Sequence, residues 1–285
     1  MRLDDHSLTR SCALCCDVAA DAVRRVSLES LPELRRNPDP SPREPLPAFF
    51  LKHADEQTVA GLCAVFQAIQ KGGLQAADFR DWGVLAAPHF LGRPAMAAAL
   101  QRFAAEGAWG VSPHLIPHRS LHSISGTVSQ ALKIHGPNFG VGGGPAGAAE
   151  IMLAATVLLE SKHLPGVWVV LTCLDPQLPP DETGRMTPGT QAVGLALALT
   201  PFRTSGSRIR LQLVRGTPDA DTLANAKGLA GSGAGFDLLR LETLLNLLHG
   251  PRGGDRTIVQ LLDAHSRLEL SRICCPSRLR LSASR

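Results

Sequence analysis

The sequence predicts an α/β fold built on a mixed β-sheet. Apolar runs typical of buried strands, at 82–87, 167–173 and 192–200, alternate with segments of helical periodicity. Residues 208–214 alternate polar and apolar side chains, which predicts a strand with one face in water. The short polar segment 204–207 separates this strand from the preceding one, so we expect the two to form an antiparallel hairpin.

Size and composition indicate a globular chain with its own core. It has 285 residues, of which 44% are hydrophobic and 19% charged, with a net charge of +4. Part of the positive excess lies in Arg272, Arg278, Arg280 and Arg285 near the C-terminus. No dense Lys/Arg block is present and tyrosine is absent, so we expect no nucleic-acid partner.

Cysteine usage favours a reduced, cytoplasmic protein. The seven cysteines are an odd number, and Cys63 and Cys173 lie in apolar runs. Cys12 and Cys15 have no second pair at zinc-finger spacing, so no metal site is expected there. No run reaches membrane-spanning length, and we expect no membrane span and no signal peptide.

Three segments are predicted along the chain. Residues 1–48 form a poorly ordered or accessory segment that ends in the proline-rich linker 37–47. Residues 49–214 form the main domain, with globular order expected from about Phe49. Residues 215–285 form a short C-terminal extension that is expected to be helical, with helices at 238–248 and 257–270.

The helices of the main domain follow from caps and apolar spacing. Asp55 can cap a helix that runs to about Gln70 and ends at Gly72-Gly73. Further helices are predicted at 94–106, 123–134 and 146–160. The buried face of the first helix is expected to consist of Val59, Leu62, Cys63, Phe66 and Ile69.

A glycine-rich turn before the helix at 146–160 is the candidate functional site. Such a strand–turn–helix unit aims backbone N–H groups at one point, where α/β proteins hold a nucleophile or an anion. The candidate residues of the turn are Asn138, Gly142, Gly143, Gly144, Pro145 and Ala146.

Pro145, at the tip of the turn, cannot act as nucleophile, acid or metal ligand. Gly142, Gly144 and Gly147 also match the spacing of the dinucleotide-binding fingerprint, which leaves dinucleotide binding as an alternative. The short preceding strand and the missing N–H of Pro145 weaken that alternative.

Three histidines recur at every fourth position: His114, His118 and His122. On one helix they could bind zinc, but Pro113 and Pro117 predict a loop, so we interpret them as lining residues. Serines in this segment leave a Ser–His pair open, although no Gly-x-Ser-x-Gly elbow surrounds them.

Residues 49–214 resemble the N-terminal half of β-ketoacyl synthases, the thiolase-fold condensing enzymes of fatty-acid and polyketide synthesis. The resemblance rests on the order and spacing of several segments, including Ser112-Pro113, Gly136-Pro137-Asn138 and the runs 50–62, 82–92, 193–199 and 208–214. It implies a thiolase-like fold in which a mixed five-stranded sheet carries helices on both faces. Residues 215–285 would then be either the helical extension or a degenerate remnant of the family's C-terminal half.

The resemblance also implies that the condensing chemistry is absent. The position of the family's nucleophilic cysteine is occupied by Pro145, and Cys173 is the closest cysteine in sequence. Lys227, with Ser232 in place of a histidine, and His265 are weakly similar to the family's lysine and histidine motifs. The residues therefore give no confident catalytic group, with His118 and His122 as weak candidates.

The expected function is that of a non-catalytic ketosynthase-like protein. It would act like a chain-length-factor subunit in acyl-chain synthesis of the fatty-acid, polyketide or aryl-polyene type, without a cofactor. Its expected partners are an acyl-carrier protein or acyl thioester and an active ketosynthase, in a homo- or hetero-oligomer. A thioesterase or decarboxylase of altered chemistry and a dinucleotide-binding protein remain as alternatives.

Overall fold

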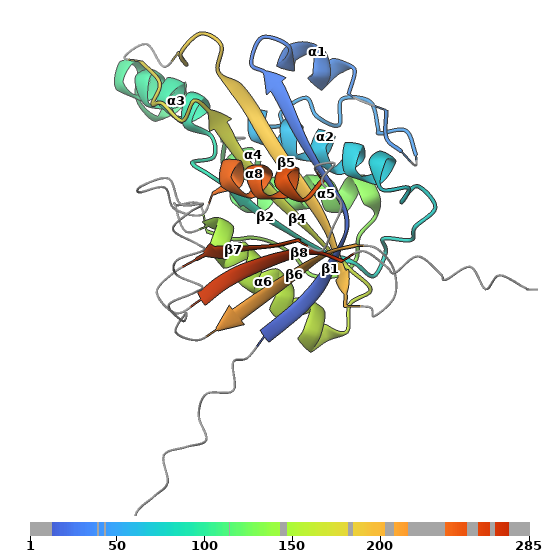
Figure 1. Cartoon of the computed structure of the whole chain (residues 1–285). Coiled ribbons are helices and arrows are strands. Elements are labelled where there is room, and N and C mark those ends of the chain that lie inside the picture. The colour runs from blue at the N-terminus through green and yellow to red at the C-terminus, as the bar shows by residue number, and fades with distance from the viewer. Residues whose placement is uncertain are drawn as a thin grey trace, which may run out of the picture.

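The computed structural model describes residues 13–38, 40–42, 44–113, 115–142, 147–181, 185–202, 208–215, 237–249, 256–262 and 266–273. Within these residues one mixed sheet has the strand order β3-β2-β4-β5-β1-β6-β8-β7 (Figure 1). The strands are β1 (Ala13–Ser27), β2 (Gly83–Pro88), β3 (Asn138–Gly140), β4 (Val167–Asp175), β5 (Gln191–Pro201), β6 (Arg208–Arg215), β7 (Arg256–Leu261) and β8 (Ser266–Ile273).

Helices connect and cover these strands. They are α1 (Leu31–Arg36), α2 (Glu56–Lys71), α3 (Arg93–Glu106), the 3₁₀ helix η1 (Gly107–Gly110), α4 (Leu115–Arg119), α5 (His122–Leu132), α6 (Gly147–Lys162) and α8 (Leu238–His249). Asp55 caps α2 as expected, because its side chain accepts a hydrogen bond from the Gln57 N–H at 2.9 Å. In the described part of the chain, no helix combines the length and apolarity needed to cross a membrane.

The predicted α/β class with a mixed sheet is confirmed. Strands β3, β2 and β4 are parallel, β5 is antiparallel to β4, and β1 is antiparallel to β5 and to β6. The sheet has eight strands among the described residues instead of the expected five, because β6, β8 and β7 extend it beyond β1.

Helices cover both faces of the sheet, as predicted. Trp168 and Val170 of β4 belong to the core cluster that contains α2 and α5. Their neighbours Val167 and Val169 point to the opposite face and belong to the cluster that contains α6 and α8. Side chains of a strand alternate between its faces, so each face of β4 carries its own helical layer.

The predicted hairpin between 192–200 and 208–214 is wrong. β5 and β6 are not neighbours, because β1 lies between them and pairs with both. The residues of β5 from Ala192 to Leu199 are buried on both faces, so this strand needs a partner at each edge, and β4 and β1 are those partners. A short connection in sequence therefore does not join neighbouring strands here.

β1 shows that ordered structure begins well before Phe49. This strand is a central element of the sheet, whereas the sequence predicted an accessory segment. A register irregularity between Val18 and Ala20 changes which face its side chains reach. Cys16 and Val18 join the cluster of α6 and α8, while Ala20 and Ala22 join the cluster of α2 and α5.

The C-terminal region is only partly helical. The helix predicted at 238–248 is confirmed as α8, but the helix predicted at 257–270 is the hairpin of β7 and β8. In β8, Leu268 and Leu270 are buried and alternate with the charged Arg267 and Glu269. This period of two matches a strand with one buried face, which outweighs the helical interpretation.

Candidate functional site

The glycine turn lies between the end of β3 and the start of α6. Asn138 begins β3, and Gly142 has a φ of +69°, a conformation that favours glycine. A Cβ on Gly142 would also lie 2.7 Å from the Cα of Gly147, the first residue of α6. The predicted turn residues Gly143, Gly144, Pro145 and Ala146 lie outside the described residues.

β3 is held close to the start of α5. It pairs in parallel with β2, with Asn138 opposite Val84 and Gly140 opposite Ala86. A Cβ on Gly140 would collide with the carbonyl of Leu121, the residue before α5. Glycine at this position therefore allows the strand to pass the Leu121 backbone and reach the turn.

A small cavity, here called the elbow cavity, lies at the start of α6. Its volume is about 20 Å³, room for a single water molecule. It is lined by Ala87, Pro88, His89, Gly147, Ala148, Leu171, Thr172, Cys173, Gln177, Asp237 and Leu238. An acyl chain or a dinucleotide would need a much larger space than the elbow cavity between its described lining residues.

The thiol in the elbow cavity is poorly suited to nucleophilic attack. Cys173 is almost fully buried, and burial raises the pKa of its thiol to about 12. The nearby carboxylate of Asp175 adds to this increase. Because the thiolate is the reactive form of cysteine, Cys173 stays in its unreactive form near neutral pH.

A closed hydrogen-bond network holds the wall of the elbow cavity. The hydroxyl of Thr172 donates to Gln57 Oε1 at 2.8 Å, and Gln57 Nε2 donates to the carbonyl of His89 at 3.1 Å. The His89 N–H donates to the Thr172 carbonyl at 2.7 Å. Gln57 of α2 thus ties β4 to the loop after β2, and the Thr172 hydroxyl is occupied by this bond.

His89 is a site residue that the sequence reasoning missed. Its partly buried ring lines the elbow cavity, and burial lowers its pKa, as does the Arg93 guanidinium. The ring packs on Phe90 with centroids 4.1 Å apart. An imidazole with a lowered pKa is neutral at physiological pH. Nothing in the local sequence distinguishes this histidine from an ordinary loop residue.

The predicted histidines lie elsewhere. His118 is on α4, where its ring packs against His53 with centroids 5.5 Å apart. His122 begins α5, and its Nδ1 is 3.4 Å from the Ser125 hydroxyl, which also donates to the His122 carbonyl. This pair lies within one helical turn, so it is local helix bonding rather than a catalytic pair.

The structure shows no metal-binding arrangement of these histidines among the residues that it describes. His114 lies outside the described residues. Among the residues that are described, no group of three His, Cys, Asp or Glu side chains could hold a metal ion.

His118 belongs to a second, larger site, here called the cationic pocket. This pocket has a volume of about 270 Å³. Its charged and titratable lining residues are Arg35, Lys52, His53, Glu56, Arg102, His118 and Arg119. The N-terminus of α2 also lies here, and the partial positive charge of a helix N-terminus adds to that of the side chains.

Two carboxylates, the buried Asp55 and the half-buried Glu56, only partly neutralise the cationic pocket. Arg119 is 3.1 Å from the buried Asp55 carboxylate, and Arg35 is 3.4 Å from Glu56. Burial and the charge of Glu56 raise the pKa of Asp55 well above its usual range, and Arg119 offsets this only in part. The pocket therefore favours an anionic ligand.

Comparison with solved structures identifies the fold. AntDE:AntF (apo), a type II PKS acyl-carrier protein in complex with its ketosynthase bound to the hexaketide, matches with a TM-score of 0.60 at 11% identity, over 90% of this chain and 98% of that chain. The ketosynthase ApeO in complex with its chain length factor ApeC from Xenorhabdus doucetiae matches with a TM-score of 0.52 at 13% identity, over 91% and 100%.

A third match is the PfaC keto synthase–chain length factor, with a TM-score of 0.50 at 10% identity, over 95% of this chain and 44% of that chain. No protein-family model and no curated relative matches the sequence. The chain therefore has the thiolase-like fold of ketosynthases and chain length factors, which confirms the fold that the sequence resemblance implied.

Proposed function

We propose that this chain is a non-catalytic ketosynthase-like subunit that works beside an active ketosynthase in acyl-chain synthesis. The observation that carries the proposal is the elbow cavity, where the described lining offers one thiol, Cys173, with a pKa of about 12. The sequence resemblance puts Pro145 at the position of the nucleophilic cysteine. Acyl transfer to this site therefore has no suitable nucleophile.

The proposed partner is a ketosynthase, in the manner of a chain length factor. ApeO is in complex with its chain length factor ApeC, and the fold of this chain is similar. Large apolar side chains on α3 and η1 support an interaction surface, since Leu100, Phe103 and Trp109 are 64%, 54% and 99% exposed. Figure 1 shows α3 at the upper left, at the periphery of the molecule.

The proposed location is the cytoplasm. Among the cysteines that the structure describes, Cys15, Cys16 and Cys173 are free, which supports a reducing compartment.

An acyl-transfer experiment tests the absence of a nucleophile. The purified chain is incubated with acyl-carrier-protein thioesters, and its intact mass is measured before and after. We expect no covalent acyl adduct, with a cysteine-bearing ketosynthase as the positive control. A stoichiometric adduct on any residue of this chain would contradict the proposal, and a Cys173→Ser variant would show whether that thiol carried it.

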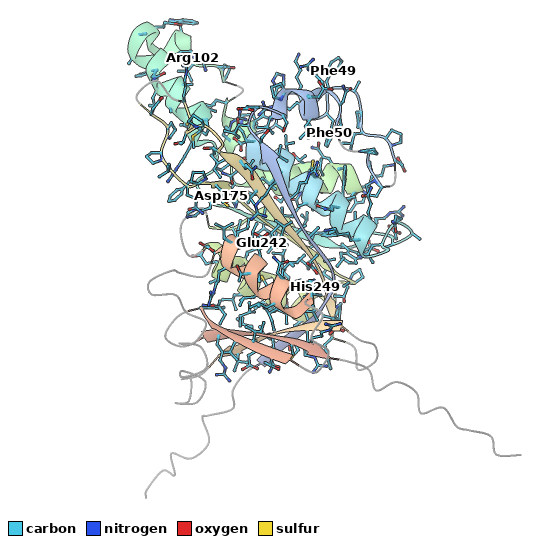
Figure 2. The ribbon with its side chains drawn as sticks, turned by 45° about the horizontal axis from the view of Figure 1, so that its top comes forward. Phe49, Phe50, Arg102, Asp175, Glu242 and His249 are labelled. Carbon is cyan, nitrogen blue, oxygen red and sulfur yellow. The ribbon has the colours of Figure 1, made fainter. Side chains whose placement is uncertain are left out.

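The carrier protein is proposed to place an anionic group in the cationic pocket. AntDE:AntF contains a carrier protein in complex with its ketosynthase. The pocket in this chain offers Lys52 and Arg102 without drawing on the buried ion pairs of Arg35 and Arg119. Figure 2 shows Arg102 on α3, away from Glu242 and His249 on α8.

Binding measurements test this contact. Fluorescence anisotropy with a labelled acyl-carrier protein should show affinity that falls as salt rises, because the contact is electrostatic. The double variant Lys52→Ala/Arg102→Ala should bind several-fold more weakly, whereas Arg36→Ala, on exposed α1, should bind like the wild type. Equal affinity of all three proteins would rule out the cationic pocket as the docking site.

A further inference from the structure

One edge of β1 is unpaired along much of its length. β1 pairs with β5 from Cys16 to Ser27, but its ladder with β6 covers only Ala13 to Val18. Within the described residues no strand pairs with this second edge beyond Val18. An open strand edge presents N–H and C=O groups that can accept another extended chain.

The ladder geometry identifies which backbone groups face this open edge. The Leu28 N–H donates to the Thr190 carbonyl across the β5 side, at 3.4 Å. Backbone groups alternate in direction along an antiparallel strand, so every second residue from Leu28 bonds to β5. The residues between them, among them Asp21, Val23 and Arg25, direct their N–H and C=O groups away from β5. With its amide nitrogen turned toward β1, Gln67 donates to the Val23 carbonyl at 3.1 Å, which agrees with this assignment.

A large groove, here called the edge groove, runs along this open edge. Its volume is about 870 Å³. Its floor is β1 from Val18 to Val23 together with Arg25, and Ile209 and Arg272 lie at its margin. One wall is formed by the end of α2 and the residues after it, Lys71, Gly72 and Leu74. The other wall is formed by α8, with Glu242, Leu245, Asn246 and His249. Figure 2 shows Glu242 and His249 along α8.

The charges around the edge groove favour an acidic ligand. Arg25 contacts Glu242 in a two-bond arrangement at 2.7 and 2.6 Å, and His249 Nε2 lies within hydrogen-bond distance of the Asp21 carboxylate, at 2.8 Å. Lys71 and Arg272 are further cations of the lining. The balance of formal charge in the groove is therefore positive.

We propose that the edge groove binds an extended, acidic segment of a partner polypeptide, which adds as a strand to β1. The backbone of the segment pairs with the outward groups of Asp21 and Arg25 and with the N–H of Val23, whose carbonyl is already bonded to Gln67. Acidic side chains of the segment approach Lys71 and Arg272, and small apolar side chains pack on the half-buried Leu74. This surface lies apart from the elbow cavity and needs no acyl chemistry, so it stands independently of the proposed function.

Synthetic peptides test the chemistry of the ligand. The probe is a fluorescein-labelled octapeptide of alternating Glu and Val, and binding to the full chain is followed by anisotropy. A Lys/Val peptide of the same length and a Glu/Val peptide N-methylated at alternate residues are the controls. Both controls should bind at least about ten-fold more weakly, because one reverses the charge and the other removes backbone donors.

Matched variants test the position of the ligand. Val23→Pro removes an N–H that faces the groove and leaves the bonds to β5, so peptide binding should fall by about ten-fold or more. Val23→Ala keeps this N–H and should bind the peptide like the wild type. If thermal denaturation shows that Val23→Pro does not fold, Lys71→Glu is the second variant, and it should also weaken binding of the acidic peptide.

Two outcomes would overturn the proposal. One is equal affinity of the wild type and both groove variants for the Glu/Val peptide, or no binding of this peptide at low salt. The other is a homodimer of the wild type that Val23→Pro dissociates in sedimentation while no peptide binds. That result would assign the open edge of β1 to a second copy of this chain.

Discussion

At the scale of single residues, glycine controls how closely α2 approaches the sheet. A Cβ on Gly194 of β5 would collide with the carbonyl of Ala60 and lie 2.8 Å from the nitrogen of Gly61. Both of these atoms belong to the backbone of α2, which cannot move without shifting the helix. The sequence run 193–199 predicts a strand, but it does not reveal that a helix presses on Gly194.

Replacing this glycine should destabilise the fold. We expect Gly194→Ala to lower the free energy of unfolding by about 1–3 kcal/mol, because the added methyl group forces α2 away from β5. Urea denaturation followed by circular dichroism measures the change. Gly147→Ala is the control, since a Cβ there meets the Ala87 side chain at an ordinary 3.7 Å. Equal stability of the two variants would contradict the close approach.

The thiols of the chain should differ in reactivity. Burial raises the pKa of Cys173 to about 12, so its thiolate is scarce at pH 8 and alkylation of the folded protein should spare it. Cys15 is exposed and should react faster with iodoacetamide. Peptide mapping by mass spectrometry at pH 8 tests this, with urea-unfolded protein as the control in which both react. Alkylation of Cys173 as fast as Cys15 in the folded protein would show that this thiol is accessible and activated.

Around the elbow cavity, the sequence predicted which residues lie in the local strand and turn, but it did not predict which distant residues contact them. The sequence placed Asn138 in a short strand and Gly142 in the turn after it, and in the structure Asn138 begins β3 and Gly142 follows that strand. His118 and His122 were read as one group, but they occupy different helices. His89 and Gln57 become part of the site only because β2, β4 and α2 meet there, a contact between segments distant in sequence.

At the scale of elements, α8 buries a leucine-rich face against the sheet. Leu238, Leu241, Leu244 and Leu245 are buried and share a core cluster with Leu268 and Leu270 of β8. Their spacing is that of one helical face, so the helix itself could be predicted from the sequence. Its position over the sheet depends on β8, which the sequence reasoning assigned to a helix.

A truncation in α8 measures this packing. Leu241→Ala removes a fully buried side chain and should lower the free energy of unfolding by about 2–5 kcal/mol. Thr243→Ala, on the exposed side of the same helix, should change it by no more than about 0.5 kcal/mol. Chemical denaturation of both variants gives the comparison. A small effect of Leu241→Ala would mean that α8 contributes little to the core.

At the scale of the whole molecule, α3 and η1 carry a peripheral apolar surface. Met96, Leu100, Phe103 and Trp109 are exposed there, and apolar patches of this kind are typical of protein–protein contacts. These residues are well separated in sequence from the elements α8 and β1, which form the edge groove. This apolar surface therefore differs in character from the cationic pocket and from the edge groove, whose linings both carry several cations.

Association through the apolar surface can be measured directly. We expect the wild-type chain to self-associate or to bind a ketosynthase at micromolar concentration, and Leu100→Glu/Trp109→Ser to weaken that association. Sedimentation velocity, alone and with the ketosynthase, is the measurement. Val157→Glu, which places the same charge at an exposed position of α6, is the control. If the wild-type chain stays monomeric and does not bind the ketosynthase, the proposed role of this surface is contradicted.

Local periodicity by itself determined the α/β class and most of the individual elements. Caps, glycine stops and apolar spacing depend on neighbours in sequence, and the helices α2, α3, α5, α6 and α8 appear at their predicted places. The order of motifs also carried the resemblance to ketosynthases, which the solved structures confirm at the level of the fold.

Only the tertiary structure decided which strands are neighbours. Strand pairing joins residues far apart in the chain, so the insertion of β1 between β5 and β6 left no local sign, and the alternation in β8 did not show which strand it pairs with. The same non-local pairing leaves the β1 edge open and gathers Lys71, Arg25 and His249 around one groove. The glycine turn could be predicted from the sequence, whereas the cavity and grooves of the molecule depend on how distant segments pack together.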